Sequence, residues 1–381
     1  MDFSINDEQL AYKNAIVEFA TSELNARFSE RDAHEEFSRD AWQACARLGI
    51  QGLPFDDRYG GQGADALTTM LAMEGLGYGT HDNGLIFSIN AHIWSGAMPI
   101  HRFGTDEQKQ KYLPGMCDGS LIAVQGMTEP DSGSDAYSLA TTVTDEGDHY
   151  VLNGSKTFIT NAPVADVFIV FATIDRSKGW AGLCALIVDR DTPGLTIGPN
   201  FHKMGLKTSP MSELIMDDCS VPKENLLGKH GSGMMIFNHS IEWERACILA
   251  STVGTMERQL DDCITYARTR QQFGKPIGKN QAVSHKIVDM KLRLETSRLL
   301  LYQLGWKAGR GDKMAMEASM VKLHLSESYL LNSLDAVQIH GASGYMAETL
   351  IEHNVRDAMA SRIYSGTNEI QKNIIAQYLK L

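Results

Sequence analysis

The chain has 381 residues, of which 43% are hydrophobic and 22% are charged, and its formal net charge is −12. This length allows two or three domains with a large core, and the acidic balance argues against nucleic-acid binding, which usually needs a basic surface. The six cysteines form no C-x-x-C pair, which excludes a zinc knuckle and a dithiol redox motif, and we expect them to be reduced and buried.

The first third of the chain is predicted to be helical. It starts without the basic and apolar segments of a signal peptide, and no uncharged apolar run approaches the roughly 18 residues of a membrane span, so we expect a cytoplasmic protein without such a span. Asn6 is placed to cap a first helix. A later helix is predicted from Asp106 to about residue 115. The apolar face of the first helix follows at helical spacing: Leu10, Val17, Ala20 and Leu24.

From about residue 121 the pattern changes to short β-branched and aromatic runs, such as 167–171 and 183–188. Asn153-Gly154, flanked by apolar residues, predicts the turn of a β-hairpin. Strands and helices do not alternate here. The segment is therefore predicted to be an antiparallel sheet or a small barrel rather than a doubly wound fold.

Helices are predicted again after Gly228. One stripe repeats at spacings of four and three, as expected for a helix in a bundle: Val283, Ile287, Met290, Leu294, Ser297, Leu301 and Leu304. The chain is therefore predicted to be an α+β protein with a helical domain over residues 1–121, a β-domain over 122–228 and a helical bundle over 229–381.

Several common chemical motifs are absent. The glycines at 75, 77 and 79 have the wrong spacing for a dinucleotide-binding loop and follow no strand. No phosphate-binding P-loop and no G-x-S-x-G nucleophile elbow occurs. The twelve histidines show no metal-ligand spacing, so packing or surface roles are expected for residues such as His239 and His340, and no metal site is predicted. An enzyme with this sequence would need an organic cofactor or a lone acid or base.

The most specific pattern lies in residues 126–135, which contain T-E-x-x-x-G-S-D. Taken alone, this stretch is a turn whose backbone amides would face a polar ring or a phosphate. Further motifs follow in residues 150–161, 268–274, 338–345 and 362–371. In this order they resemble the signatures of the acyl-CoA dehydrogenase family, and the resemblance covers essentially the whole chain.

The resemblance implies the fold of that family: an N-terminal helical domain, a middle β-domain and a C-terminal four-helix bundle. It also implies FAD as the cofactor and assembly as a homotetramer. Two positions depart from the family pattern. Ala342 stands where glycine is usual, which bears on a flavin contact, and His353 stands where Lys or Arg is frequent, which bears on an ion pair.

By this resemblance, the isoalloxazine ring of FAD is walled by residues of the middle domain: Gln125, Met127, Thr128, Gly133, Ser134, Phe158, Ile159 and Thr160. The ADP part meets residues of a neighbouring subunit: Arg270, Gln272, Phe273, Gln338, Gly341 and Ala342. Thr367 and Glu369 contact the adenosine or the pyrophosphate. The fork of Arg270 suits pyrophosphate oxygens, although without the other motifs it is also a typical solvated cation at a helix end.

Such an enzyme needs a base that removes the α-proton of an acyl thioester while the β-hydrogen leaves as hydride to the flavin. Most family members carry the basic Glu in the segment I-Y-E-G-T, where this chain has Ser365. Isovaleryl- and long-chain-type members instead place a Glu directly before an Arg on another helix. Glu244-Arg245 matches that pattern. We therefore predict that Glu244 is the base, with Arg245 beside it, and that the backbone N–H of Ser365, together with a ribityl hydroxyl of FAD, polarises the thioester carbonyl.

The residues around Glu244 leave alternatives. Glu244 is also compatible with a surface acid of an amphipathic helix. Glu242 is the second acid nearby, and about 200° of rotation separates the two, so at most one of them points inward. Glu244 lies between Ile241 and Ile248 on the apolar side, where an acid is unusual unless it is paired or functional.

Within the family, the chain most resembles dehydrogenases that oxidise L-prolyl groups tethered to peptidyl carrier proteins in natural-product pathways. The shared features are residues 159–168, the pair Trp243-Glu244, residues 267–275 and residues 361–372 with Ser365 in the vacated Glu position. The substrate implied is a prolyl thioester on a phosphopantetheine arm. The alternatives are a short- or branched-chain acyl-CoA dehydrogenase and a non-catalytic family member that acts as a scaffold.

The same resemblance implies two partners. One is an acyl or peptidyl carrier protein, whose acidic surface would need basic docking residues; the candidates are Arg268, Lys275, Lys279 and Lys286. The other is an electron acceptor, either an electron-transfer flavoprotein or oxygen.

Overall fold

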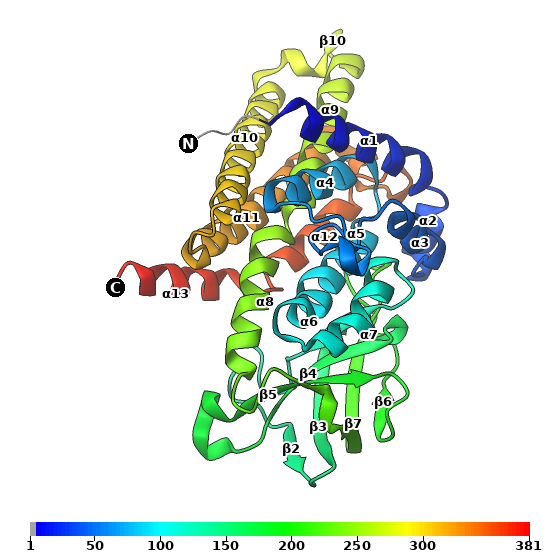
Figure 1. Ribbon diagram of the computed structural model, residues 1–381. Coiled ribbons are helices and arrows are strands. Elements are labelled where there is room, and N and C mark those ends of the chain that lie inside the picture. Colours follow the sequence, from blue (N-terminus) through cyan, green and yellow to red (C-terminus); the bar gives the residue numbers. More distant parts are fainter. Residues whose placement is uncertain (1–4) are drawn as a thin grey trace.

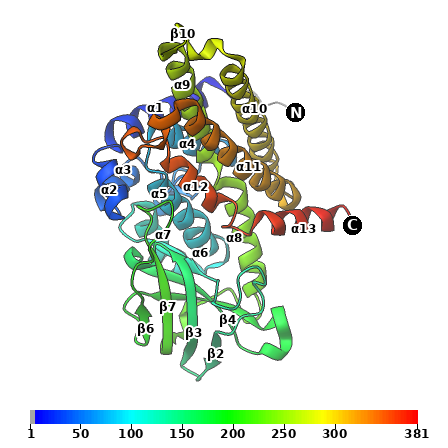
Figure 2. The same cartoon turned by 180° about the vertical axis from the view of Figure 1, so that it is seen from behind.

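The computed structural model describes residues 5–381 (Figures 1 and 2). A β-sheet forms one end of the molecule and helices form the other. Helix α8 (Gly233–Cys247) starts beside the sheet and runs into the helical part. The front helices, blue and cyan in Figure 1, pack against the yellow and orange helices of the second half of the chain.

The helical front contains α1 (Asp7–Glu23), α2 (Phe28–His34), α3 (Arg39–Arg47), α4 (Ala66–Gly79), α5 (Asn83–Asn90), a π-helical segment (Ala91–Ala97), α6 (Met98–Phe103) and α7 (Asp106–Cys117). The cap at Asn6 is confirmed, as part of a reciprocal capping box with Gln9. The prediction for Leu10 is wrong, because this side chain is 47% exposed. The packed face runs through buried Ile16 and Ala20, and Leu10 lies roughly 120° around the helix from Ile16.

The strands are β1 (Ala123–Gly126), β2 (Thr142–Asp145), β3 (His149–Thr160), β4 (Val167–Thr173), β5 (Leu183–Asp189), β6 (Leu195–Ile197), β7 (Met211–Pro222) and β8 (Leu226–Leu227). They lie in the order β6-β7-β3-β2-β4-β5-β8, with β1 on β4. Most pairs are antiparallel, as predicted, but β1 and β2 both pair with β4 in parallel, so the sheet is mixed. The prediction of a purely antiparallel sheet therefore needs this correction.

The predicted hairpin at Asn153-Gly154 is wrong. Strand β3 continues through this dipeptide and pairs with β2 on one side and β7 on the other, with a register shift between Leu152 and Gly154. Gly154 has a φ of 144°, and a Cβ there would lie 2.7 Å from Thr141 Oγ1. The glycine therefore serves a bulge and a close approach instead of a turn.

The second half contains α8, α9 (Ala250–Thr269), α10 (Gln281–Gly309), α11 (Ala315–His340), α12 (His353–Ser361) and α13 (Asn368–Tyr378), with the short pair β9 (Gln271–Gln272) and β10 (Lys275–Pro276) between α9 and α10. The predicted stripe of α10 is confirmed, since its members from Met290 to Leu304 are buried. Helices α4 and α9 touch through glycines: a Cβ on Gly254 would lie 1.9 Å from the carbonyl oxygen of Glu74.

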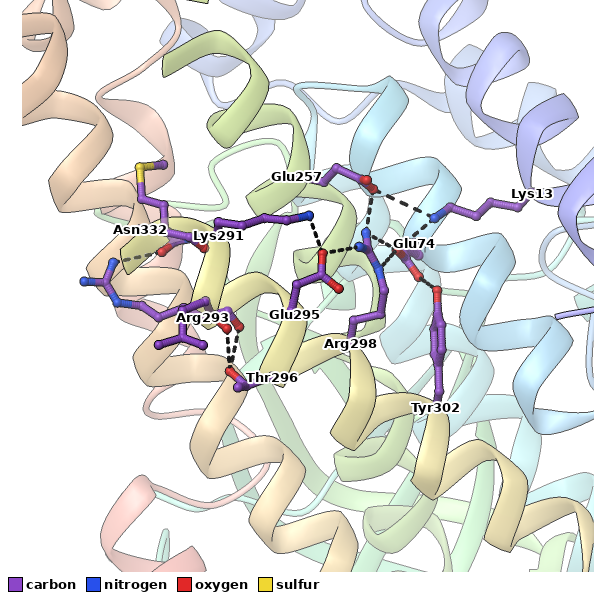
Figure 3. A network of polar contacts seen from close by, with 12 residues as sticks. Lys13, Glu74, Glu257, Lys291, Arg293, Glu295, Thr296, Arg298, Tyr302 and Asn332 are labelled. Carbon is purple, nitrogen blue, oxygen red and sulfur yellow. Dashed lines mark hydrogen bonds and ion pairs between the residues drawn. The ribbon is translucent and has the colours of Figure 1, made fainter. Parts of the chain in front are cut away.

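A buried ion network joins the two helical parts (Figure 3). Glu74 of α4 is fully buried and accepts hydrogen bonds from Lys13 of α1 at 2.8 Å and from Tyr302 of α10 at 2.7 Å. Arg298 of α10 donates to the same carboxylate at 2.9 Å and to Glu257 of α9 at 2.7 Å. Because a buried carboxylate without partners is costly, this network ties three helices to α4.

The six cysteines are buried and unpaired, as predicted. No helix within residues 5–381 has the length and apolar character that crossing a bilayer requires.

Candidate active site

The carboxylate of Glu244 lies inside the molecule, with the residue only 8% exposed. Its neighbours on the same face of α8, Ile241 and Ile248, are buried too. Two hydroxyls donate hydrogen bonds to it, Ser95 Oγ to Oε2 and Ser365 Oγ to Oε1. A carboxylate has about four lone-pair sites, so each oxygen keeps capacity to accept a proton.

Ser95 comes from the π-helical segment Ala91–Ala97, which links α5 to α6. The neighbouring Trp94 stacks on Trp243, the residue before Glu244, with ring centroids 5.9 Å apart and planes 7° from parallel. On its other side the segment touches β1, where a Cβ on Gly96 would lie 2.6 Å from Ala123. The wider π turn, which often marks functional sites, thus lies between the sheet and α8.

Ser365 lies on the loop between α12 and α13 with a φ of 56°. This left-handed conformation costs a non-glycine residue about 1–2 kcal/mol, and such strain concentrates at functional sites. The Ser365 carbonyl accepts hydrogen bonds from Arg245 Nε at 2.9 Å and from Gln371 Nε2 at 3.1 Å. Within residues 5–381, no protein acceptor takes the Ser365 N–H.

Burial and nearby charges shift the pKa values of Arg245 and Tyr364, which lie next to Glu244 and Ser365 in the sequence. Burial lowers the pKa of Arg245, and the nearby charges of Glu244 and Tyr137 oppose that shift. Burial, with a further contribution from Glu244, raises the pKa of Tyr364. Tyr364 lies against Phe87, with ring centroids 4.7 Å apart. The site therefore combines one carboxylate that can accept a proton with one backbone N–H that can donate a hydrogen bond.

A small cavity lies between α5, the start of α9 and α12. Its lining includes Phe87, Tyr364 and Ile248, which is one turn after Glu244, together with the polar residues Thr252 and Asp357. With a volume of about 20 Å³, this cavity has room for about one water molecule.

Family models match three successive parts of the chain. The N-terminal domain of acyl-CoA dehydrogenase matches residues 6–120, the middle domain 125–219 and the C-terminal domain 231–380. The chain belongs to the acyl-CoA dehydrogenase family. The predicted family and α+β fold are thereby confirmed.

Individual members of this family match along their whole length. An L-prolyl-[peptidyl-carrier protein] dehydrogenase of Pseudomonas fluorescens is 42% identical over 100% of both chains, and a short-chain-specific acyl-CoA dehydrogenase of Clostridium acetobutylicum is 36% identical over 99% of both. Among solved structures, the prolyl acyl carrier protein oxidase AnaB is 49% identical with a TM-score of 0.98, covering 99% of this chain and 100% of that one. The structure titled PigA with FAD and proline is 40% identical with a TM-score of 0.98 over 100% of both.

In this member of the acyl-CoA dehydrogenase family, the predicted ring-wall residues lie on β1, in the loop after it and near the end of β3. Gln125 of β1 accepts a hydrogen bond at 3.1 Å from Ser240 of α8, one turn before Glu244. Met127 and Ile159 are buried. Phe158 is 62% exposed at a φ of 57°. Thr128 and Thr160 are half-buried, and Gly133 and Ser134 lie exposed in the loop after β1.

The predicted ADP-binding residues lie elsewhere. Arg270, Gln272 and Phe273 are exposed in the β9–β10 turn, which lies at the opposite end of the molecule from the sheet in both views (Figures 1 and 2). Gln338, Gly341 and Ala342 are exposed too. They lie near that turn, since the adjacent His340 stacks on Tyr266 of α9 with ring centroids 4.4 Å apart. One chain therefore does not bring these two groups together, as expected if the second group serves a neighbouring subunit. Thr367 caps α13 and Glu369 is exposed in its first turn.

Three side chains that the sequence analysis weighed have structural partners. Glu242 is half-buried and accepts a hydrogen bond from Met314 N at 3.3 Å, away from Ser95 and Ser365. His353 is buried against Phe28, and burial lowers its pKa well below the usual value. His239 packs edge-on against Phe103.

Ser95 was missed by the sequence analysis. It lies in a long run of buried residues, and a lone serine there carries no chemical pattern. The only available signal was the small number of polar residues in this run: Ser88, Asn90, His92 and Ser95.

Proposed function

We propose that this protein is an FAD-dependent dehydrogenase that oxidises an L-prolyl thioester on a carrier protein between Cα and Cβ. The observation that best supports this proposal is the buried carboxylate of Glu244. It accepts hydrogen bonds from the hydroxyls of Ser95 and the strained Ser365. The relatives named as prolyl carrier protein dehydrogenases, matched over their full length, support the substrate class. The solved relatives whose titles name FAD support the cofactor.

The residues present fit a flavin. Phe158 of β3, an inner strand, is 62% exposed, and open space surrounds Gly133. Phe273 is 95% exposed, and Arg270 beside the same turn offers a guanidinium fork. The flavin ring would cover Phe158 and Gly133. The pyrophosphate would bind at Arg270 and Phe273, which a neighbouring subunit of a homotetramer would supply.

The residues of the protein have separate roles in this reaction. FAD, when bound, supplies the acceptor for the β-hydride. Glu244 accepts the Cα proton, while the hydroxyls of Ser95 and Ser365 fix the orientation of its carboxylate. The Ser365 N–H donates to the thioester oxygen as negative charge develops there, and such a donor is typically worth about 3 kcal/mol. Arg245 holds the Ser365 carbonyl and is therefore a positioning residue.

The reaction removes one proton and one hydride, which leaves a dehydroprolyl thioester. A second oxidation of the same kind would give the pyrrole-2-carboxyl thioester. The electrons pass on to an electron-transfer flavoprotein or to oxygen, and stopped-flow mixing of the reduced enzyme with each acceptor separates the two.

The test is anaerobic reduction of the purified holoenzyme. Bleaching of the yellow flavin by a prolyl-loaded carrier protein, with little effect of acyl-CoAs, is the expected result. Bleaching by isovaleryl-CoA but not by the prolyl carrier would replace the substrate with a branched acyl-CoA. A flavin that no thioester bleaches would leave only the scaffold role.

A further inference from the structure

Three segments meet at the start of α8, the helix that carries Glu244. Tyr137, in the loop after β1, donates a hydrogen bond to Asn238 Oδ1 of α8 at 2.6 Å, and its ring meets Phe237 edge-on. The phenol is also close enough to Arg245 to influence its pKa. Asn238 is exposed and lies six residues before Glu244, about 9 Å along the helix axis. We call Tyr137, Phe237 and Asn238 the rim.

Next to this rim lies the 3-10 segment Arg176–Gly182, the green loop beside the lower end of α8 in Figure 1. Arg176 donates a hydrogen bond to the carbonyl of Ala140, in the loop that carries Tyr137. A Cβ on Gly231, just before α8, would lie 2.7 Å from the carbonyl oxygen of Ala181. The loop after β1, the segment Arg176–Gly182 and the start of α8 therefore form one continuous surface.

This surface is basic and carries an exposed aromatic side chain. Arg176 and Lys229 are exposed, and neither side chain lies within ion-pair distance of a carboxylate in residues 5–381. Lys178 pairs with Asp175 at 3.4 Å, with 63% of its side chain exposed. Trp180 is 57% exposed. We name this group, Arg176, Lys178, Trp180 and Lys229, the Trp180 surface. Within Arg176–Gly182 and its flanks, three cations accompany one carboxylate, that of Asp175, whereas the whole chain has a formal net charge of −12. The loop after β1 adds two exposed acids, Asp131 and Asp135.

We propose that the Trp180 surface is where the acidic carrier protein docks, an inference that rests on the proposed function. A carrier seated at the rim of Tyr137 and Asn238 would bring its arm to the helix that carries Glu244, and the Trp180 surface offers complementary charge there. An exposed tryptophan flanked by cations is the composition of an interface hot spot. The basic candidates taken from the sequence, such as Lys279, lie at the far end of the molecule near β10.

Two substrates that share one acyl group isolate the docking step. The first is L-prolyl thioester on a phosphopantetheinylated carrier protein, and the second is S-(L-prolyl)-pantetheine, which has the same reacting atoms but no protein. Anaerobic stopped-flow flavin reduction at subsaturating concentration gives a second-order rate constant for each. For Lys178→Glu, Lys229→Glu and Trp180→Ala we expect at least a tenfold loss with the carrier substrate and less than a twofold change with the pantetheine substrate.

Arg47→Glu, an exposed charge reversal on α3 of the helical front, is the matched control and should leave both rate constants unchanged. Raising the salt concentration should slow the wild type with the carrier substrate alone, because exposed charges are screened. Equal losses on both substrates, no loss on either, or a loss with Lys279→Glu in place of the surface variants would each overturn the docking assignment. A wild-type flavin that neither prolyl substrate can reduce would instead refute the proposed function itself.

Discussion

The hydroxyl of Ser95 donates a hydrogen bond to Glu244 across 149 residues of sequence. The donor lies in a π-helical turn and the acceptor on α8, and the stacked rings of Trp94 and Trp243 hold the two elements together directly beside this contact. A flexible acid would sample several rotamers. This one is fixed at both oxygens, because Ser365 binds the other. The orientation of this carboxylate is therefore fixed before any substrate binds.

Ser95→Ala should lower kcat of the thioester oxidation about tenfold or more while KM changes little. A hydrogen bond to a charged group is worth about 1.5–3 kcal/mol, and its loss frees the carboxylate to leave the orientation that the reaction requires. Steady-state kinetics with the prolyl carrier measures the split. Ser95→Thr, which keeps the hydroxyl, should recover much of the rate. Ser88→Ala, which removes a hydroxyl bonded to Ser209 in the same helical run, serves as the control. A kcat that stays at the wild-type value in Ser95→Ala would contradict the positioning role.

Glu244→Gln should slow anaerobic flavin reduction by about 10²–10⁴, the usual contribution of a general base. The amide keeps the size of the side chain but accepts no proton. FAD content and visible spectrum should remain those of the wild type, which a titration of the flavin absorbance against protein concentration checks. Glu242→Gln should retain activity within a few-fold, since that carboxylate faces Met314 N. The opposite ranking of the two variants would move the base to Glu242.

Two substitutions of Ser365 should separate its hydroxyl from its backbone. Both Ser365→Ala and Ser365→Gly remove the hydrogen bond to Glu244, so both should reduce the flavin more slowly. The alanine keeps the left-handed φ of 56°, whereas glycine adopts it without a steric penalty. The free energy of unfolding, from denaturant titration, should therefore be about 1 kcal/mol higher for the glycine variant than for the alanine variant. Equal stabilities would show that Ser365 is not strained.

Much of this site follows from local sequence. The burial of Glu244 was predictable because Ile241 and Ile248 lie three and four residues away on the same helix face. The stripe of α10 was predictable for the same reason. The contacts of Ser95 and Ser365 with Glu244 were not, because they join segments that only the tertiary fold brings together.

The Asn153-Gly154 dipeptide shows that a local pattern alone does not distinguish a turn from a strand. The same pair of residues suits a tight turn and a bulge within a strand. Pairing of β3 with β7 decides between them, and β7 begins more than 50 residues later at Met211. The long-range partner is thus what the dipeptide alone cannot indicate.

The carboxyl of Asp357, which lines the small cavity between α5, α9 and α12, should make stability depend on pH. It accepts hydrogen bonds from Leu206 N at 2.6 Å and from Asn83 Nδ2 at 2.9 Å, and burial raises its pKa to about 6. Since the folded state holds this proton more tightly than the unfolded state, the contribution is fully present below about pH 4 and is lost as the pH rises through about 6. Relative to Asp357→Asn, which carries no such proton, the free energy of unfolding of the wild type should fall by roughly 2 kcal/mol between pH 4 and pH 7. Denaturant titrations of both proteins at each pH measure the difference, which cancels the titration of all other groups. A constant difference across this range would mean that the carboxyl stays ionised in the folded protein.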